Sequence, residues 1–129
     1  MDGEKFAVRD GVLLEYSGQE SQVEIPGGVT EIGRNVFRNC RELREAVIPD
    51  GVVKIGSFAF EDSGLEKITF PAGLEVIEDN AFRKTNLRRV VLPEGLKEIG
   101  FKAFSRISDL RQVHIPASVQ TIWHGCFQG

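Results

Sequence analysis

Cysteine, tryptophan, histidine and long apolar runs are all scarce in this chain of 129 residues, and these scarcities exclude several classes of protein. Two cysteines are too few for the disulfide framework of a small secreted scaffold. No apolar run approaches the roughly 20 residues of a membrane-spanning helix, and the first five residues, MDGEK, do not resemble a signal peptide. A formal net charge of −3 does not suggest a nucleic-acid or membrane binder. With 41% hydrophobic residues, the composition predicts one soluble globular domain.

Motifs of catalytic and cofactor sites are also missing. The chain has no G-x-G-x-x-G, no Walker-type loop, no H-E-x-x-H and no C-x-x-C. His124 and Cys126 are the one pair with a conceivable metal or catalytic role, but a partly exposed histidine beside a small core thiol is the favoured interpretation. We therefore predict no catalytic residue, no cofactor and no metal, and we expect the chain not to be an enzyme.

Five prolines mark a tandem repeat. They are spaced by 23, 22, 22 and 23 residues, at Pro26, Pro49, Pro71, Pro93 and Pro116. An isoleucine stands six positions after each proline, at Ile32, Ile55, Ile77, Ile99 and Ile122. A phenylalanine stands eleven positions after each, at Phe37, Phe60, Phe82, Phe104 and Phe127. A unit this short cannot bury its own apolar face, so the units must stack on one another.

One unit indicates how each repeat is built. The segment 65–70 ends in alternating apolar and polar residues, which is typical of a short strand, and Pro71 ends that strand. Pro71-Ala72-Gly73 fits a type I turn with proline at its second position. The segment 79–82 resembles a helical turn that Asp79 caps. The prediction is a β-rich α/β fold, a right-handed solenoid with one short parallel strand per repeat.

Stacking in register places equivalent residues in columns. We expect one buried column of Phe60, Phe82 and Phe104, and a second of Ile55, Ile77 and Ile99. Cys40 and Cys126 lie four repeats apart, or roughly 19 Å at about 4.8 Å per strand. A disulfide requires Cα atoms within about 7 Å, so these cysteines should not pair.

The repeat resembles a known family. Ile48-Pro49-Asp50-Gly51-Val52, followed by Ile55-Gly56 and Ala59-Phe60, is similar to the leucine-rich repeat of the bacterial BspA-like, or treponemal, type. The resemblance implies a protein-recognition module of a bacterial surface or secreted protein, with adhesion as the associated role. Because the chain carries no signal peptide, a cytoplasmic location stays open.

The two ends of the chain depart from the repeat. We predict a single domain over residues 1–129, with an N-terminal cap at 1–21 and about four and a half repeats at 22–129. The cap should contain a hairpin around Asp10-Gly11. The last strand, near Val113–Ile115, is expected to be open, which leaves self-association through this end as the alternative function.

Charge changes sign along the chain, for which a solvated surface is the favoured interpretation and contact between chains the alternative. Residues 1–32 hold two basic and seven acidic groups, a net −5, whereas residues 79–112 hold eight and four, a net +4. The acidic N-terminal end of one chain is therefore able to attract the basic region of another.

Strand alternation predicts which side chains reach a partner. The residues between the inward apolar positions should face outward on the sheet. Two outward valines among charges of both signs are typical of a protein-binding patch; alternatively, these side chains merely favour strand packing. Trp123 is either a second anchor or a cover for the last repeat. The predicted partner-binding face consists of Glu45, Val47, Lys67, Thr69, Arg89, Val91, Gln112 and His114.

Overall fold

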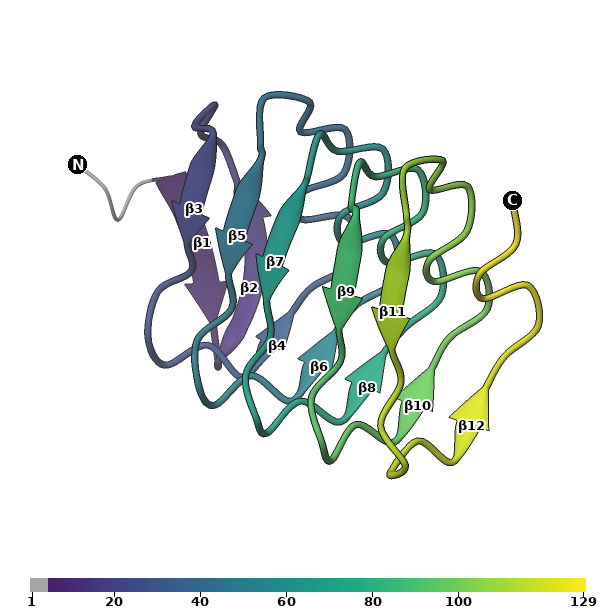
Figure 1. The fold of residues 1–129 in the computed structure, drawn as a ribbon. Coiled ribbons are helices and arrows are strands. Elements are labelled where there is room, and N and C mark those ends of the chain that lie inside the picture. The colour runs from purple at the N-terminus through teal and green to yellow at the C-terminus, as the bar shows by residue number, and fades with distance from the viewer. Residues whose placement is uncertain (1–4) are drawn as a thin grey trace.

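Each repeat forms one turn of a right-handed coil, and successive coils lie side by side along one axis (Figure 1). This computed structural model describes residues 5–129, within which there is no α-helix. One strand of each coil belongs to what we call the front sheet, and its strands are parallel. The front strands are β3 (Gln22–Glu24), β5 (Glu45–Val47), β7 (Lys67–Thr69), β9 (Arg89–Val91) and β11 (Gln112–His114).

A second strand in each coil forms the rear sheet, so the prediction of one strand per repeat is wrong. These strands have only two residues, which is too short for an alternating pattern to be recognised in the sequence. Each rear strand ends at the isoleucine of its repeat, and the side chain of that isoleucine points inward. The rear strands are β4 (Glu31–Ile32), β6 (Lys54–Ile55), β8 (Val76–Ile77), β10 (Glu98–Ile99) and β12 (Thr121–Ile122).

The hairpin predicted in the N-terminal cap is confirmed. Strands β1 (Phe6–Arg9) and β2 (Val12–Tyr16) are antiparallel, and their turn has Asp10 and Gly11 at φ 52° and 81°, as a primed hairpin turn requires. Strand β2 pairs with β4 and thereby extends the rear sheet. The predicted boundary between cap and repeats at residue 21/22 stays a prediction, and residues 1–4 of the cap lie outside the described residues.

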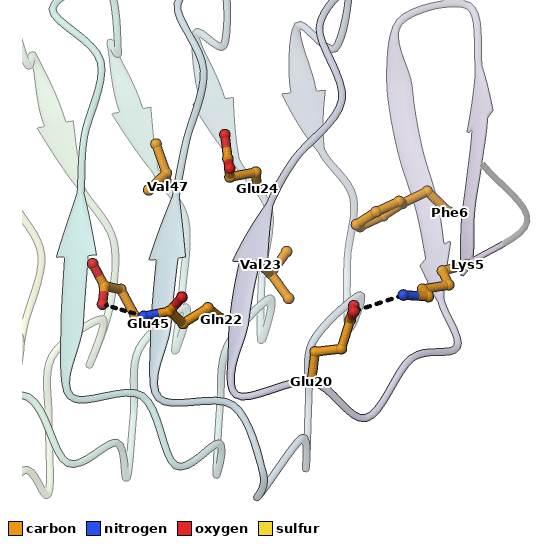
Figure 2. Close-up of a pocket in the computed structure, with 8 residues that line it drawn as sticks. All are labelled: Lys5, Phe6, Glu20, Gln22, Val23, Glu24, Glu45 and Val47. Atoms are coloured by element: carbon orange, nitrogen blue, oxygen red, sulfur yellow. Dashed lines mark hydrogen bonds and ion pairs between the residues drawn. The ribbon is translucent and has the colours of Figure 1, made fainter. Parts of the chain in front are cut away.

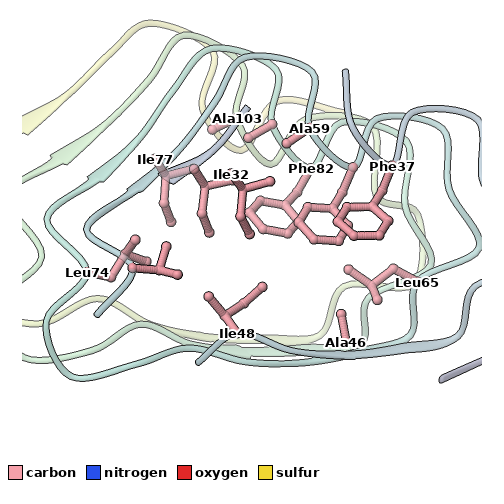
Figure 3. Close-up of a cluster of buried hydrophobic side chains, with 14 of the residues drawn as sticks. Ile32, Phe37, Ala46, Ile48, Ala59, Leu65, Leu74, Ile77, Phe82 and Ala103 are labelled. Atoms are coloured by element: carbon pink, nitrogen blue, oxygen red, sulfur yellow. The ribbon is translucent and has the colours of Figure 1, made fainter. Parts of the chain in front are cut away.

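The core contains the two predicted side-chain columns, which run along the axis beside further buried leucine, valine and alanine side chains (Figure 3). Phe60, Phe82 and Phe104 are buried, and their rings stack at 5.0 and 5.1 Å between centroids. Phe37 extends the stack at 4.9 Å, and the cap continues it through Tyr16 at 5.0 Å. The isoleucine column is buried from Ile32 to Ile99, with Leu13 of the cap at its head.

The turn that follows each rear strand is not helical, contrary to the prediction for residues 79–82. Asn80 has a φ of 58°, in the left-handed region that a helix excludes. Phe82 N–H donates to the Ala103 carbonyl of the next coil at 2.8 Å, and the Asp79 carboxylate accepts from Phe101 N–H at 2.8 Å. Hydrogen bonds between coils therefore replace those of a helix. Left-handed residues recur in pairs: Asn35 and Asn39, Phe58 and Asp62, Asn80 and Lys84, Lys102 and Arg106, and Gly125 and Gly129.

The turn after each front strand also differs from the prediction. Leu74 N–H donates to the Pro71 carbonyl at 3.3 Å, so proline occupies the first position of the turn and not the second. Gly51 and Gly95, two residues after Pro49 and Pro93, adopt a φ of 100° and 121°, whereas Gly73 after Pro71 does not have a positive φ. Glycine is used there because side chains rarely tolerate that backbone conformation.

Truncating the phenylalanine column should destabilise the whole stack. We expect Phe82→Ala to lower the free energy of unfolding by about 3–5 kcal/mol, because it leaves a cavity between two rings. Phe101→Ala is the matched control, since it removes the same kind of ring at a position outside the column that is 37% exposed, and it should cost far less. Urea unfolding followed by circular dichroism measures both, and equal stabilities for the two variants would contradict the role given to the column.

Candidate functional site

The eight residues of the predicted partner-binding face all lie on the outer side of the front sheet. Parallel pairing aligns Glu45 with Lys67 and Val47 with Thr69 across β5 and β7. The same register aligns Arg89 with Gln112 and Val91 with His114 across β9 and β11. Glu45 is half-buried and the other seven are exposed. That they bind a partner stays a prediction.

Two valines supply the apolar part of this face. Val47 is 38% exposed and Val91 is 55% exposed, unusually high for β-branched side chains in a sheet. Around them the polar groups are only partly paired. Glu45 accepts a hydrogen bond from Gln22 at 3.3 Å, and His114 Nε2 lies 3.1 Å from a Glu94 carboxylate oxygen. The face therefore combines isolated apolar groups with charges of both signs.

A hollow of about 390 Å³ opens at the N-terminal edge of the front sheet, between β3 and the hairpin (Figure 2). Carboxylates dominate its rim, with an ion pair of 2.6 Å between Lys5 and Glu20 on the hairpin side. Sequence reasoning missed it, because the cap lies outside the repeat register. The lining residues are Lys5, Phe6, Glu20, Gln22, Val23, Glu24, Glu45 and Val47.

A second hollow, of about 490 Å³, lies in the front sheet itself, between β7 and β9. These two strands belong to separate hydrogen-bonded sheets, whereas every other pair of successive front strands is hydrogen-bonded. The repeat register predicts an uninterrupted sheet, so nothing in the motif indicated this break. We call it the seam; it is lined by Glu45, Glu66, Lys67, Ile68, Thr69, Arg88, Arg89 and Val91.

The C-terminal end of the stack leaves apolar side chains uncovered. Trp123 is 52% exposed, and its indole N–H donates to a Glu98 carboxylate oxygen at 2.6 Å. The ring of Phe127 stacks on Phe104 at 5.6 Å and is itself 36% exposed. Ile115 and Ile122 are also exposed at this end.

The cysteines and histidines do not assemble into a reactive site. Both cysteines are free, and burial raises the pKa of the Cys126 thiol to about 11, so it is almost wholly protonated near neutral pH. Burial also raises the pKa of Cys40. The ring of His124 lies 6.0 Å from that of Phe101. Across residues 5–129, no three His, Cys, Asp or Glu side chains are grouped so as to hold a metal ion. The described residues also contain no helix of the length and apolarity that crossing a membrane requires.

These features define a leucine-rich-repeat solenoid with an exposed parallel sheet on one side. The family model of the BspA-type leucine-rich repeat region matches residues 14–129, in six copies. The chain belongs to this family, which confirms the resemblance seen in the sequence. Repeats of this kind are typically non-catalytic modules of protein–protein interaction.

Solved structures of bacterial leucine-rich repeat proteins share the fold. The chain is 30% identical to the T. pallidum leucine-rich repeat protein TpLRR, with a TM-score of 0.89, and the match covers 95% of this chain and 63% of TpLRR. It is 25% identical to a leucine-rich repeat protein from Eubacterium ventriosum, with a TM-score of 0.74, covering 87% of this chain and 33% of the other. For the pneumococcal vaccine antigen PcpA the identity is 23% and the TM-score 0.72, covering 95% and 38%. The chain thus spans less than two thirds of the length of each. Among curated proteins, no match was found.

Proposed function

We propose that the outer face of the front sheet binds another protein. The observation that carries this proposal is the pair Val47 and Val91, both well exposed on strands whose neighbouring outward residues are charged. An apolar centre within a polar rim is the usual composition of a protein-binding surface. The strands hold these side chains on a rigid frame, so little conformational entropy is lost on binding.

A fourfold variant tests the face. We expect Val47→Ser and Val91→Ser, combined with Lys67→Glu and Arg89→Glu, to abolish binding to a partner selected from a panel of purified extracellular-matrix and serum proteins. The melting temperature should hardly change, because all four side chains are exposed. Surface plasmon resonance measures binding and circular dichroism measures stability.

The matched control makes the same kinds of change elsewhere on the surface. It combines Val8→Ser and Val53→Ser with Lys97→Glu and Arg106→Glu, all at exposed positions outside the front sheet. This control should keep the partner's affinity. If the front-sheet variant also kept it, the binding surface would lie elsewhere, and Trp123 would be the next position to vary.

We further propose that the chain acts at a bacterial surface or in the secreted fraction, in an adhesion-type role. Support comes from family membership and from TpLRR and the vaccine antigen PcpA as structural relatives. Protease added to intact cells that express the native gene should digest the chain while sparing a cytoplasmic marker. Digestion only after lysis would place it inside the cell and contradict this proposal.

A second candidate function is self-association through the C-terminal end. Residues 113–129 contain no Asp, Glu, Lys or Arg, and β11 and β12 each pair with a neighbour on one side only. A last coil with an apolar outer face favours association, because a terminal repeat normally presents a polar outer face. Two copies meeting end to end around a twofold axis would cover the same apolar groups on both, without repulsion between like charges.

Sedimentation across protein and salt concentration tests this association. We expect a dimer at high protein concentration that persists in high salt, since the end itself is uncharged. Ile115→Ser with Ile122→Ser should shift the equilibrium to monomer, whereas Val8→Ser with Leu14→Ser, at comparably exposed positions of the cap, should not. Loss of the dimer in salt alone would instead favour contact between the acidic cap and the basic region. A monomer under all conditions contradicts the second candidate.

A further inference from the structure

The seam between β7 and β9 has a specific cause in the sequence. Strand β7 carries Ile68, whereas the equivalent inward residues of the other front strands are Val23, Ala46, Val90 and Val113. Phe70 follows where the other repeats have isoleucine or leucine, and its ring packs edge-on against Phe82 at 5.7 Å. Ile68 and Phe70 are thus each the largest side chain at their position among the five coils, and both belong to the same coil. Such overpacking displaces backbone, and we attribute the missing strand pairing to it.

Backbone hydrogen bonds define how far the seam extends. At the other junctions, a residue just before or at the start of one strand donates to the preceding coil, as Glu66 N–H does to the Arg44 carbonyl at 2.7 Å. Within residues 5–129, neither Arg88 nor Arg89 N–H makes the corresponding bond to the Glu66 carbonyl. Phe70 N–H makes none to the Val91 carbonyl, although the equivalent Ile48 N–H donates to the Thr69 carbonyl of the following coil at 3.0 Å. Backbone hydrogen bonds between β7 and β9 are therefore missing at both ends of these strands, and Ile68 is half-exposed between them.

The charges around the seam are unequally satisfied. Of the two carboxylates, Glu66 pairs with Arg44 at 3.7 Å and Glu45 accepts from Gln22 at 3.3 Å. The three cations, Lys67, Arg88 and Arg89, make no ion pair with any other residue between 5 and 129. The seam therefore presents unpaired positive charge and unbonded backbone N–H groups to the same hollow. Both kinds of group favour an anionic acceptor.

We propose that the seam binds carboxylate side chains of an acidic, extended segment of the protein partner. Arginine guanidinium groups hold carboxylates by paired hydrogen bonds, and the lysine adds a point charge beside them. Ile68 at the base of the hollow gives the aliphatic part of a glutamate side chain an apolar contact. A peptide fits better than a polysulfated glycan, because a glutamate side chain offers both a carboxylate to the cations and aliphatic carbons to Ile68. This inference rests on the proposed binding function of the front sheet and names the chemistry of its partner.

A titration monitored by NMR tests the seam directly, with hexaglutamate as the probe and hexaglutamine as the neutral reference. Hexaglutamate should move the amide resonances of residues 66–70 and 88–91 in a saturable way. Lys67→Gln with Arg89→Gln should weaken binding by about tenfold. Lys97→Gln with Arg106→Gln, which removes the same charge outside the seam, should leave it unchanged. Hexaglutamine should move none of these resonances.

Three results would overturn the proposal. One is the absence of any shift, and another is shifts spread evenly over all basic residues, which would mean unspecific attraction. The third is saturable binding of a heparin hexasaccharide at residues 66–70 and 88–91 without binding of hexaglutamate, which would make the seam a glycan site. If hexaglutamate fails while the fourfold front-sheet variant still loses its protein partner, the proposed function stands and the seam alone is excluded.

Discussion

The stacking of one coil on the next is the constraint on which the rest of this molecule depends. Rings of successive coils lie 4.9 to 5.6 Å apart along the phenylalanine column, close to the spacing of about 4.8 Å between paired strands. Moving one coil length along the axis therefore brings both the rings into contact and the backbone groups into hydrogen-bonding distance. The front strands are related by the same translation. Residues that are one repeat apart in the sequence are therefore neighbours on the outer face of the front sheet.

The stacking combines a uniform interior with a varied outer face. Inward positions are restricted to a few apolar types, while outward positions along the front sheet change from Glu45 to Lys67 and Arg89. Charges of opposite sign on one rigid sheet give orientation to a partner and suppress unsuitable partners.

Places where stacking is incomplete have a separate importance. At the seam, β7 and β9 are not hydrogen-bonded to each other, and three cations line the same hollow. Within residues 5–129, no coil covers the exposed side chains of Ile115, Ile122 and Trp123. Both irregularities leave backbone or apolar groups whose burial by a partner would be favourable. The two places differ in charge, because Lys67, Arg88 and Arg89 line the seam whereas residues 113–129 contain no Asp, Glu, Lys or Arg.

The sequence by itself determined the repeat, its register, the two core columns, the hairpin and the outward side of the front sheet. Each follows from spacing, since a residue type that recurs every 22 or 23 positions has no other way to be buried. Tertiary structure alone decided the two-residue rear strands and the left-handed turns, because hydrogen bonds between coils outweigh the local helical preference of a segment such as 79–82. It also decided the seam, since two slightly larger side chains become significant only when neighbouring coils must fit against them.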